Sequence, residues 1–267
     1  MKKLISFDDH IFIAGGSGMV GSSLHRTLTN AGYGDKIKGG ALLAPSRKEL
    51  NLLNFNDVLN WYETFKPNVV IIAAGKVGGI NANATFPADF ILENLKIQTN
   101  LIELAWKTDV KRLLFLGSSC IYPKFSKQPI KEDYLLENSL EPTNEYYAIS
   151  KIAGIKLCES LRRQYNFDAI SLMPTNLYGP RDNYIKSESH VLPALIRKFE
   201  EAKRDNLKSV SCWGSGLPKR EFLHVDDLSK ACLYVLENWD PSSKNSPHNK
   251  NKEKLSFLNV GSGEEIT

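Results

Sequence analysis

Short apolar runs that alternate with longer helical patterns most strongly constrain the fold of this chain. The predicted strands are residues 11–14, 41–46, 69–75, 112–117 and 169–177. The predicted helices between them are residues 19–32, 54–66, 87–107 and 147–165. The strand runs are almost continuously apolar, which is typical of strands buried on both faces. The alternation therefore predicts right-handed βαβ units and an α/β fold of the Rossmann type, with a doubly wound parallel sheet.

Composition and charge exclude several classes of protein. The net charge is +4, and the 34 basic and 30 acidic residues are interspersed, which argues against a nucleic-acid or membrane-surface partner. No apolar run approaches the ~20 residues of a membrane span, and the N-terminus lacks a signal-peptide pattern. The cysteines are scattered without a CxxC pair, which predicts no disulfide framework, no metal site and a reducing cytoplasm.

A GxxGxxG arrangement lies between the first predicted strand and the first predicted helix. Glycines let the backbone turn tightly and approach a pyrophosphate, and the helix N-terminus offers N–H groups and a positive dipole end. Because a strand precedes the loop and a helix follows it, the loop predicts dinucleotide binding; the alternative is a tight turn without a ligand. The predicted contacts are Gly15, Gly16, Ser17, Gly18, Met19, Val20 and Gly21.

The end of the second predicted strand bears on the choice of nicotinamide cofactor. An acidic residue often stands here when the ribose 2′-hydroxyl is bound, whereas this chain has Ser46, Arg47 and Lys48. A cation suits a 2′-phosphate, so NADP(H) is favoured over NAD(H). Glu49, an acidic residue close by, weakens the case for NADP(H). The alternative interpretation is that Arg47 and Lys48 are ordinary solvated surface charges.

Tyr147 and Lys151 stand four residues apart in EYYAISK, which places them on one helix face. An ammonium beside a phenol predicts a lowered tyrosine pKa, and therefore proton exchange near neutral pH. A YxxxK pair alone is equally consistent with an exposed helix face. Ser118, at the end of the fourth predicted strand, could hydrogen-bond the same substrate oxygen. Cys120, two residues further on, is either a small buried hydrophobe or a base.

The glycine loop, Ser118, Tyr147 and Lys151 resemble the extended short-chain dehydrogenase/reductase family. Longer stretches resemble its GDP-L-fucose synthases: AAGKVGGINANATFPADFI, LGSSCIYPKFSKQPI, PTNEYYAISKIAGIKLCES, MPTNLYGP, SHVLPAL and WGSGLPKREFLHVDD. The resemblance covers residues 11–267. It implies a homodimer that uses NADPH for the 3,5-epimerisation and 4-reduction of GDP-4-keto-6-deoxy-D-mannose to GDP-L-fucose.

The resemblance also implies roles for particular residues. In the family a cysteine and a histidine are the base and acid of epimerisation, and they match Cys120 and His190. Tyr147 would protonate the C4 oxygen during reduction. Lys151 would hold the nicotinamide ribose and tune Tyr147, while Ser118 would polarise the C4 oxygen throughout.

Further binding residues follow from the same resemblance. The expected cofactor contacts outside the glycine loop are Arg47, Leu52, Lys151, Pro174, Thr175, Asn176, Leu177 and His190. Lys198, Trp213 and Arg220 are expected at the nucleotide end of the substrate, because cations suit phosphate and an indole can pack on the ligand. Lys198 stands where an arginine is frequent, so bidentate pairing is lost there.

The predicted domains are a nucleotide-binding Rossmann domain and a smaller substrate-binding lobe. We assign residues 1–177 to the NADP-binding domain, with a return segment at about 220–240. Residues 178–219 and 241–267 are assigned to the substrate-binding lobe. The closing stretch FLNVGSGEEIT predicts a strand and then the start of a helix, so we expect a further C-terminal piece.

Other functions on the same scaffold remain open from the sequence. A 4,6-dehydratase is expected to carry an Asp–Glu pair after the serine, whereas Ile121 and Tyr122 follow Cys120 here. A 4-epimerase retains bound NAD and needs neither Cys120 nor His190. A non-catalytic NADP(H)-sensing protein often lacks the tyrosine or the lysine, and both are present in this chain.

Overall fold

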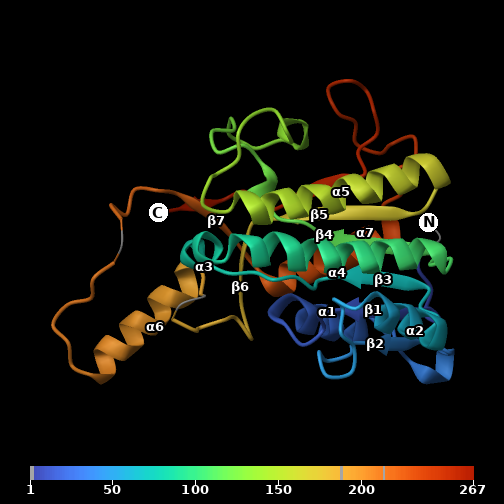
Figure 1. Cartoon of the computed structure of the whole chain (residues 1–267), viewed down its shortest axis with the longest axis horizontal. Helices are drawn as coiled ribbons and strands as arrows, with labels where there is room; N and C mark the ends of the chain where they lie inside the picture. Colours follow the sequence, from blue (N-terminus) through green and yellow to red (C-terminus); the bar gives the residue numbers. More distant parts are fainter. Residues whose placement is uncertain (1–2, 187–188, 213) are drawn as a thin grey trace.

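A parallel sheet forms the centre of the computed structural model, which describes residues 3–186, 189–212 and 214–267. Within these residues six strands lie in the order β2-β1-β3-β4-β5-β8, and every neighbouring pair is parallel (Figure 1). They are β1 (His10–Ala14), β2 (Ala41–Leu43), β3 (Val69–Ile72), β4 (Arg112–Leu116), β5 (Ala169–Pro174) and β8 (Phe257–Val260). The predicted Rossmann-type sheet is confirmed.

Two layers of helices cover the sheet. One face packs against α2 (Phe55–Phe65), α4 (Pro87–Lys107) and α5 (Glu145–Tyr165), and the other against α1 (Met19–Asn30) and α7 (Val225–Asn238). Side chains alternate between the two faces along each strand, so that Phe12 joins the first apolar cluster and Ile13 the second. No helix among the described residues is both long and apolar enough to cross a membrane.

Helices α4 and α5 lie side by side and fix the position of the α5 side chains. Gln98 is buried on α4, and its Nε2 donates to the Ser150 carbonyl oxygen at 2.6 Å. Gly154 lets α5 approach the sheet, because a Cβ there would lie 2.5 Å from Cζ of Phe115 on β4. The first turns of α5 are therefore held against the carboxyl end of β4.

A smaller group of strands lies beyond the carboxyl edge of the sheet. Strand β7 (Arg220–His224) pairs in parallel with β6 (Asn176–Tyr178) and antiparallel with β9 (Glu265–Ile266). The expected helix start near the end of the chain is therefore wrong: backbone pairing with β7 holds residues 265–266 extended. Helix α3 (Ile80–Thr85), helix α6 (Val191–Arg204) and the short 3-10 helices η1 (Lys36–Lys38), η2 (Ser119–Ile121) and η3 (Glu132–Tyr134) occupy the connections.

Strand β8 departs from the domain assignment made on the sequence. Residues 241–267 were assigned to the substrate-binding lobe, yet β8 pairs with β5 in the main sheet. Its first residue, Phe257, is buried in the apolar cluster beneath α4 and α5, which explains why the chain returns to the sheet here. The other domain boundaries stay a prediction.

Candidate active site

The segment after β4 places Ser118 and Cys120 at the carboxyl edge of the sheet. Ser118 is the N-cap of η2, and its Oγ accepts a hydrogen bond from the Cys120 backbone N–H at 3.3 Å. This short helix follows a fully buried strand, so both side chains start from a rigid support. Such an edge is where parallel α/β sheets bind ligands.

Tyr147 and Lys151 lie one turn apart near the start of α5, as predicted. The Lys151 side chain is buried, and its Nζ donates to the Leu116 carbonyl oxygen at 2.9 Å. The same Nζ lies 6.0 Å from the centroid of the Tyr147 ring and 4.9 Å from that of Phe115. The lysine therefore sits beneath the tyrosine, between α5 and β4.

Ser118 connects the tyrosine with the cysteine. Hydrogen bonds from Ser118 act on both the Tyr147 phenol and the Cys120 thiol, and in each case they lower the pKa. Tyr147 and Cys120 are also close enough for a charge on the sulfur to raise the pKa of the phenol. The structure thus brings Ser118, Cys120, Tyr147 and Lys151 together in one cluster.

The electrostatics of this cluster differ from the expectation made on the sequence. Burial raises the pKa of Tyr147 well above its ordinary value, and this outweighs the opposing hydrogen bond from Ser118. Burial also lowers the pKa of Lys151 to about 8. The expected lowering of the tyrosine pKa by its lysine is therefore wrong for the protein alone, because the loss of solvent dominates at both groups.

Cys120 has a raised pKa together with groups that favour its thiolate. Burial raises the pKa of the thiol; Ser118, the Cys120 backbone N–H, Asn144 and the charge of Arg220 lower it. The thiol is half-buried rather than sealed in the core. By contrast, Cys158 and Cys232 are buried, and burial raises the pKa of each to about 12.

His190 lies just before α6, as its N-cap residue, and does not cap the helix with its side chain. The surrounding protein lowers the pKa of its imidazole, and the carboxylate of Asp182 acts in the opposite direction. Asp182 was not identified from the sequence, although it follows MPTNLYGP closely. Among the described residues, no hydrogen bond or ion pair links His190 to Ser118 or Cys120.

The glycine loop fits a pyrophosphate. Gly15 has φ 87°, and a Cβ at Gly21 would lie 2.1 Å from the Gly15 carbonyl oxygen. The N-cap of α1 is Gly18, which offers no side chain to the first N–H groups of the helix, so a bound anion can accept from them. Thr175, at the same carboxyl edge of the sheet on the β5–β6 connection, keeps a buried Oγ1 that has no partner among the described atoms. These residues suit a dinucleotide.

Arg47 is exposed in the turn after β2, beside the glycine loop. The nearby Glu49 carboxylate accepts a hydrogen bond from the Ser46 N–H at 2.7 Å, and hydrogen bonding at Ser46 lowers its pKa. The negative charge of Glu49, which counted against NADP(H), is therefore bound to the backbone of its own turn. No described carboxylate forms an ion pair with Arg47. Leu52, the other cofactor contact expected here, is half-buried against the core.

The remaining predicted contacts occupy the carboxyl side of β5 and the second lobe. Pro174 ends β5, Leu177 is half-buried on β6, and the Asn176 side chain donates to the Glu221 carbonyl oxygen at 3.0 Å. Lys198 lies on α6, to one side of the sheet in Figure 1, and its Nζ donates to the Ser211 carbonyl oxygen at 3.2 Å. Arg220 is exposed at the start of β7. Trp213 lies outside the described residues.

The sequence interpretation missed the side chains that brace the loop after β3. The Asn94 side chain accepts from the Lys76 N–H at 2.9 Å and donates to the Lys76 carbonyl oxygen at 3.0 Å. The Lys76 ammonium pairs with Glu93 at 2.5 Å and with Asp89 at 3.2 Å. The KVGG motif was the available signal, since residues 76–79 form the second half of this loop and lead into α3.

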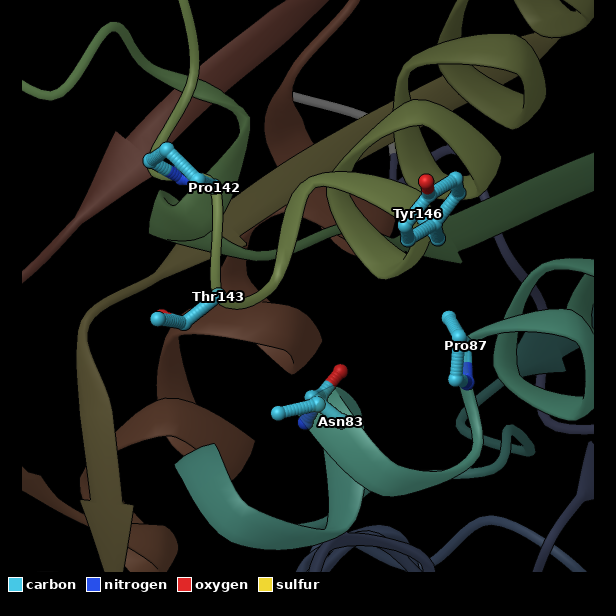
Figure 2. Close-up of a pocket in the computed structure, with 6 residues that line it drawn as sticks. Asn83, Pro87, Pro142, Thr143 and Tyr146 are labelled. Atoms are coloured by element: carbon cyan, nitrogen blue, oxygen red, sulfur yellow. The ribbon is translucent and has the colours of Figure 1, made fainter.

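A surface pocket of about 270 Å³ adjoins the start of α5 (Figure 2). It is lined by Asn83, Ala84, Pro87, Pro142, Thr143 and Tyr146. Asn83 comes from α3, and its Nδ2 donates to the carbonyl oxygens of Gly78 and Gly79 at 2.7 and 3.1 Å. The pocket thus borders the loop that leads into α5.

Comparisons with known proteins identify the family of this chain. Residues 11–249 match the model of the NAD dependent epimerase/dehydratase family. GDP-L-fucose synthase 1 of Arabidopsis thaliana is 52% identical, covering 96% of this chain and 74% of its own length. GDP-L-fucose synthase of Escherichia coli (strain K12) is 51% identical, covering 96% and 77%.

A solved structure shares the fold as well as the sequence. A GDP-D-glycero-L-gluco-heptose synthase from Campylobacter jejuni, crystallised in the presence of NADPH, superposes with a TM-score of 0.85 at 33% identity, covering 98% of this chain and 83% of its own. These findings confirm the resemblance carried by the sequence motifs. The chain belongs to the NAD dependent epimerase/dehydratase family and, within it, to the family of the GDP-L-fucose synthases.

Proposed function

We propose that this protein converts GDP-4-keto-6-deoxy-D-mannose to GDP-L-fucose with NADPH, as a 3,5-epimerase and 4-reductase. The observation that carries the proposal is the position of Ser118 between Tyr147 and Cys120. A reducing site needs a proton donor at the C4 oxygen, and an epimerising site needs a base beside it. Ser118 gives the two groups a common hydrogen-bond partner at the carboxyl end of β4.

Epimerisation begins at the carbons beside the ketone. The C4 carbonyl acidifies the protons on C3 and C5, and Cys120 as thiolate removes one of them. The new S–H bond forms as the C–H bond breaks, and the electron pair moves to the C4 oxygen, where Ser118 and Tyr147 stabilise the enolate by hydrogen bonding. His190 returns a proton to the opposite ring face, with inversion of the carbon.

Reduction uses the same oxygen. Bound NADPH supplies the hydride that reduces C4. Tyr147 donates its phenolic proton to the C4 oxygen, and its raised pKa keeps the phenol protonated at neutral pH until that step. Lys151 would hold the nicotinamide ribose from below the tyrosine, through donors not used on the Leu116 carbonyl oxygen.

The residues around the glycine loop would hold the cofactor. The first N–H groups of α1 receive the pyrophosphate, and the exposed Arg47 receives the 2′-phosphate, which accounts for NADPH rather than NADH. Thr175 offers its buried hydroxyl to the cofactor. Arg220 and Lys198 receive the diphosphate of the nucleotide sugar.

We also infer a homodimer in the cytoplasm. The family resemblance implies pairing through long helices. Large apolar side chains are exposed on and beside α4 and α5: Ile80, Phe86, Leu92, Tyr146 and Ile149. A second copy of the chain would cover them. Light scattering should then give twice the 30.0 kDa chain mass, whereas a monomer at micromolar concentration would contradict the pairing.

Cys120→Ser tests the role that distinguishes this enzyme from a simple reductase. The variant should lose solvent deuterium incorporation at C3 and C5, because a serine hydroxyl is a far weaker acid than a thiol and supplies little anionic base. Reduction of the unepimerised ketone should persist. Cys212→Ser, at an exposed cysteine, is the matched control and should exchange normally. Normal exchange in Cys120→Ser would remove Cys120 as the base.

A further inference from the structure

Asn259 is the polar residue of β8, whose other three residues are apolar. The strand lies at the edge of the main sheet, beside β5. An edge strand directs part of its backbone N–H groups away from the sheet, where they need other partners. At Asn259 this N–H donates to the Glu132 carboxylate at 2.8 Å. The segment that follows β4 therefore covers the edge of the sheet at this residue.

The Asn259 side chain bonds the same segment with both ends of its carboxamide. Its Oδ1 accepts from the Tyr122 hydroxyl at 2.5 Å, and its Nδ2 donates to the Ile130 carbonyl oxygen at 3.1 Å. The acceptor and the donor of an amide are fixed relative to each other, so one bond orients the group for the other. Together with the bond to Glu132, these contacts tie residues 122, 130 and 132 to β8.

Tyr122 lies two residues after Cys120 and determines where η2 ends. Its backbone N–H donates to the Ser119 carbonyl oxygen at 3.3 Å, which closes this short helix. The Tyr122 side chain is buried in the apolar cluster beneath α4 and α5. A buried tyrosine hydroxyl requires a hydrogen-bond partner, and Asn259 provides it. The bond between these two side chains therefore helps to fix the backbone on either side of Cys120.

The other end of the segment rests on the same two strands. Gly117 lies between β4 and Ser118, and a Cβ there would lie 2.3 Å from Sδ of Met173 on β5. Met173 is in turn the residue that pairs with Asn259 across β5 and β8. The backbone that carries Ser118 and Cys120 is therefore located by β5 and β8 as well as by β4.

The residues assigned to reduction have a different support. Tyr147 and Lys151 belong to α5, which Gln98 of α4 holds through the Ser150 carbonyl oxygen. Loss of the bonds to Asn259 should therefore displace η2 and leave the start of α5 in place.

We propose that Asn259 is a positioning residue for epimerisation, which fixes Tyr122 and thereby the short helix that presents Cys120 to the substrate. The inference deepens the proposed function and rests on it for the role of Cys120. Asn259 acts through Tyr122 and not on the sugar.

The test removes each partner of the hydrogen bond in turn. Tyr122→Phe deletes the hydroxyl alone, and Asn259→Leu deletes the carboxamide at similar volume. Each variant is mixed with GDP-4-keto-6-deoxy-D-mannose and NADPH in deuterated buffer, and the sugar products are separated. The rate of deuterium incorporation at C3 and C5 should fall about tenfold or more, because a small displacement of a base slows proton transfer. Reduction should persist, so unepimerised GDP-6-deoxyhexose should accumulate relative to GDP-L-fucose.

Control variants separate positioning from a loss of stability. Tyr62→Phe removes another buried tyrosine hydroxyl, which donates to the Leu101 carbonyl oxygen at 3.0 Å between α2 and α4. It should lower the thermal stability and leave the product ratio at the wild-type value. Asn138→Leu, at an exposed asparagine in the β4–α5 connection, should change neither. A merely structural role of Asn259 predicts a constant product ratio in every folded variant.

The double variant tests whether the two side chains act through one bond. Tyr122→Phe combined with Asn259→Leu should lose no more deuterium incorporation than Asn259→Leu alone, because both changes remove the same contact. Multiplied losses in the double variant would contradict a shared role.

The outcomes are also separable from the proposed function. A wild-type product ratio in both single variants would overturn the inference, while formation of GDP-L-fucose by the wild type would leave the proposed function intact. A wild type that incorporates no deuterium at C3 and C5 would instead overturn the proposed function. Hydrogen exchange of the backbone amides of residues 118–124 then decides the positioning itself: faster exchange in both single variants retains it, and unchanged exchange removes it.

Discussion

Lys151 is a buried cation beneath Tyr147, and the pH dependence of folding should reveal it. Burial lowers its pKa from 10.5 to about 8 in the folded protein. Between these values the unfolded chain binds more protons than the folded one, so this lysine makes the free energy of unfolding rise with pH. At pH 7 the lysine is charged in both states, and its burial weakens folding.

The size of the effect follows from the two pKa values. Each pKa unit is worth about 1.4 kcal/mol, so the fall to about 8 costs the folded state about 3 kcal/mol at pH 7. Lys151→Met removes the charge and keeps most of the volume. The variant also loses the hydrogen bond to the Leu116 carbonyl oxygen, and the weakening of this bond when the lysine loses its proton is part of the same titration.

The measurement is urea denaturation of cofactor-free protein from pH 7 to 10. The stability advantage of Lys151→Met over wild type should shrink by about 2.5 kcal/mol across this range. Buried tyrosines and cysteines also titrate here, but they are common to both proteins and cancel in the difference. Lys156→Met, an exposed lysine on the same helix, is the control and should show a constant difference. A constant difference for Lys151→Met would refute the buried charge.

Other perturbations test the cofactor loop and the scaffold. Gly21→Ala should abolish the rise in thermal stability caused by NADPH, because its Cβ would lie 2.1 Å from the Gly15 carbonyl oxygen; a normal rise would contradict the close approach. Arg47→Glu should raise the KM for NADPH about tenfold or more and spare NADH, and equal effects on both would exclude a 2′-phosphate contact. Asp168→Ala should lower the free energy of unfolding by about 3 kcal/mol in denaturant, because the fully buried Arg112 loses its carboxylate partner; a change below about 1 kcal/mol would show that water replaces it.

The main sheet could be predicted because burial on both faces leaves a pattern in each strand. Residues 69–72 and 113–116 are all apolar, and Arg112 forms an ion pair with Asp168. Each of these strands could therefore be predicted from its own residues alone. Strand β9 has no such pattern: its two residues are exposed, and only backbone pairing with β7 holds them extended. A local pattern does not specify a partner that lies more than 40 residues away.

In the site, the sequence predicted which residues meet but not how their surroundings change their pKa values. Ser118, Cys120, Tyr147 and Lys151 were predictable because strand ends and helix spacing determine which side chains can meet. The direction of the tyrosine pKa was not, since it depends on how much protein surrounds the phenol.

The most direct test of the account follows the full reaction. Purified protein is mixed with GDP-4-keto-6-deoxy-D-mannose and NADPH in deuterated buffer, cofactor oxidation is recorded, and the sugar product is identified by NMR. The account predicts GDP-L-fucose carrying deuterium at C3 and C5, formed with one NADPH oxidised per sugar. A GDP-6-deoxyhexose that keeps the original configuration and protons at C3 and C5 would contradict the epimerase role of Cys120, and no NADPH oxidation would contradict the proposed function as a whole.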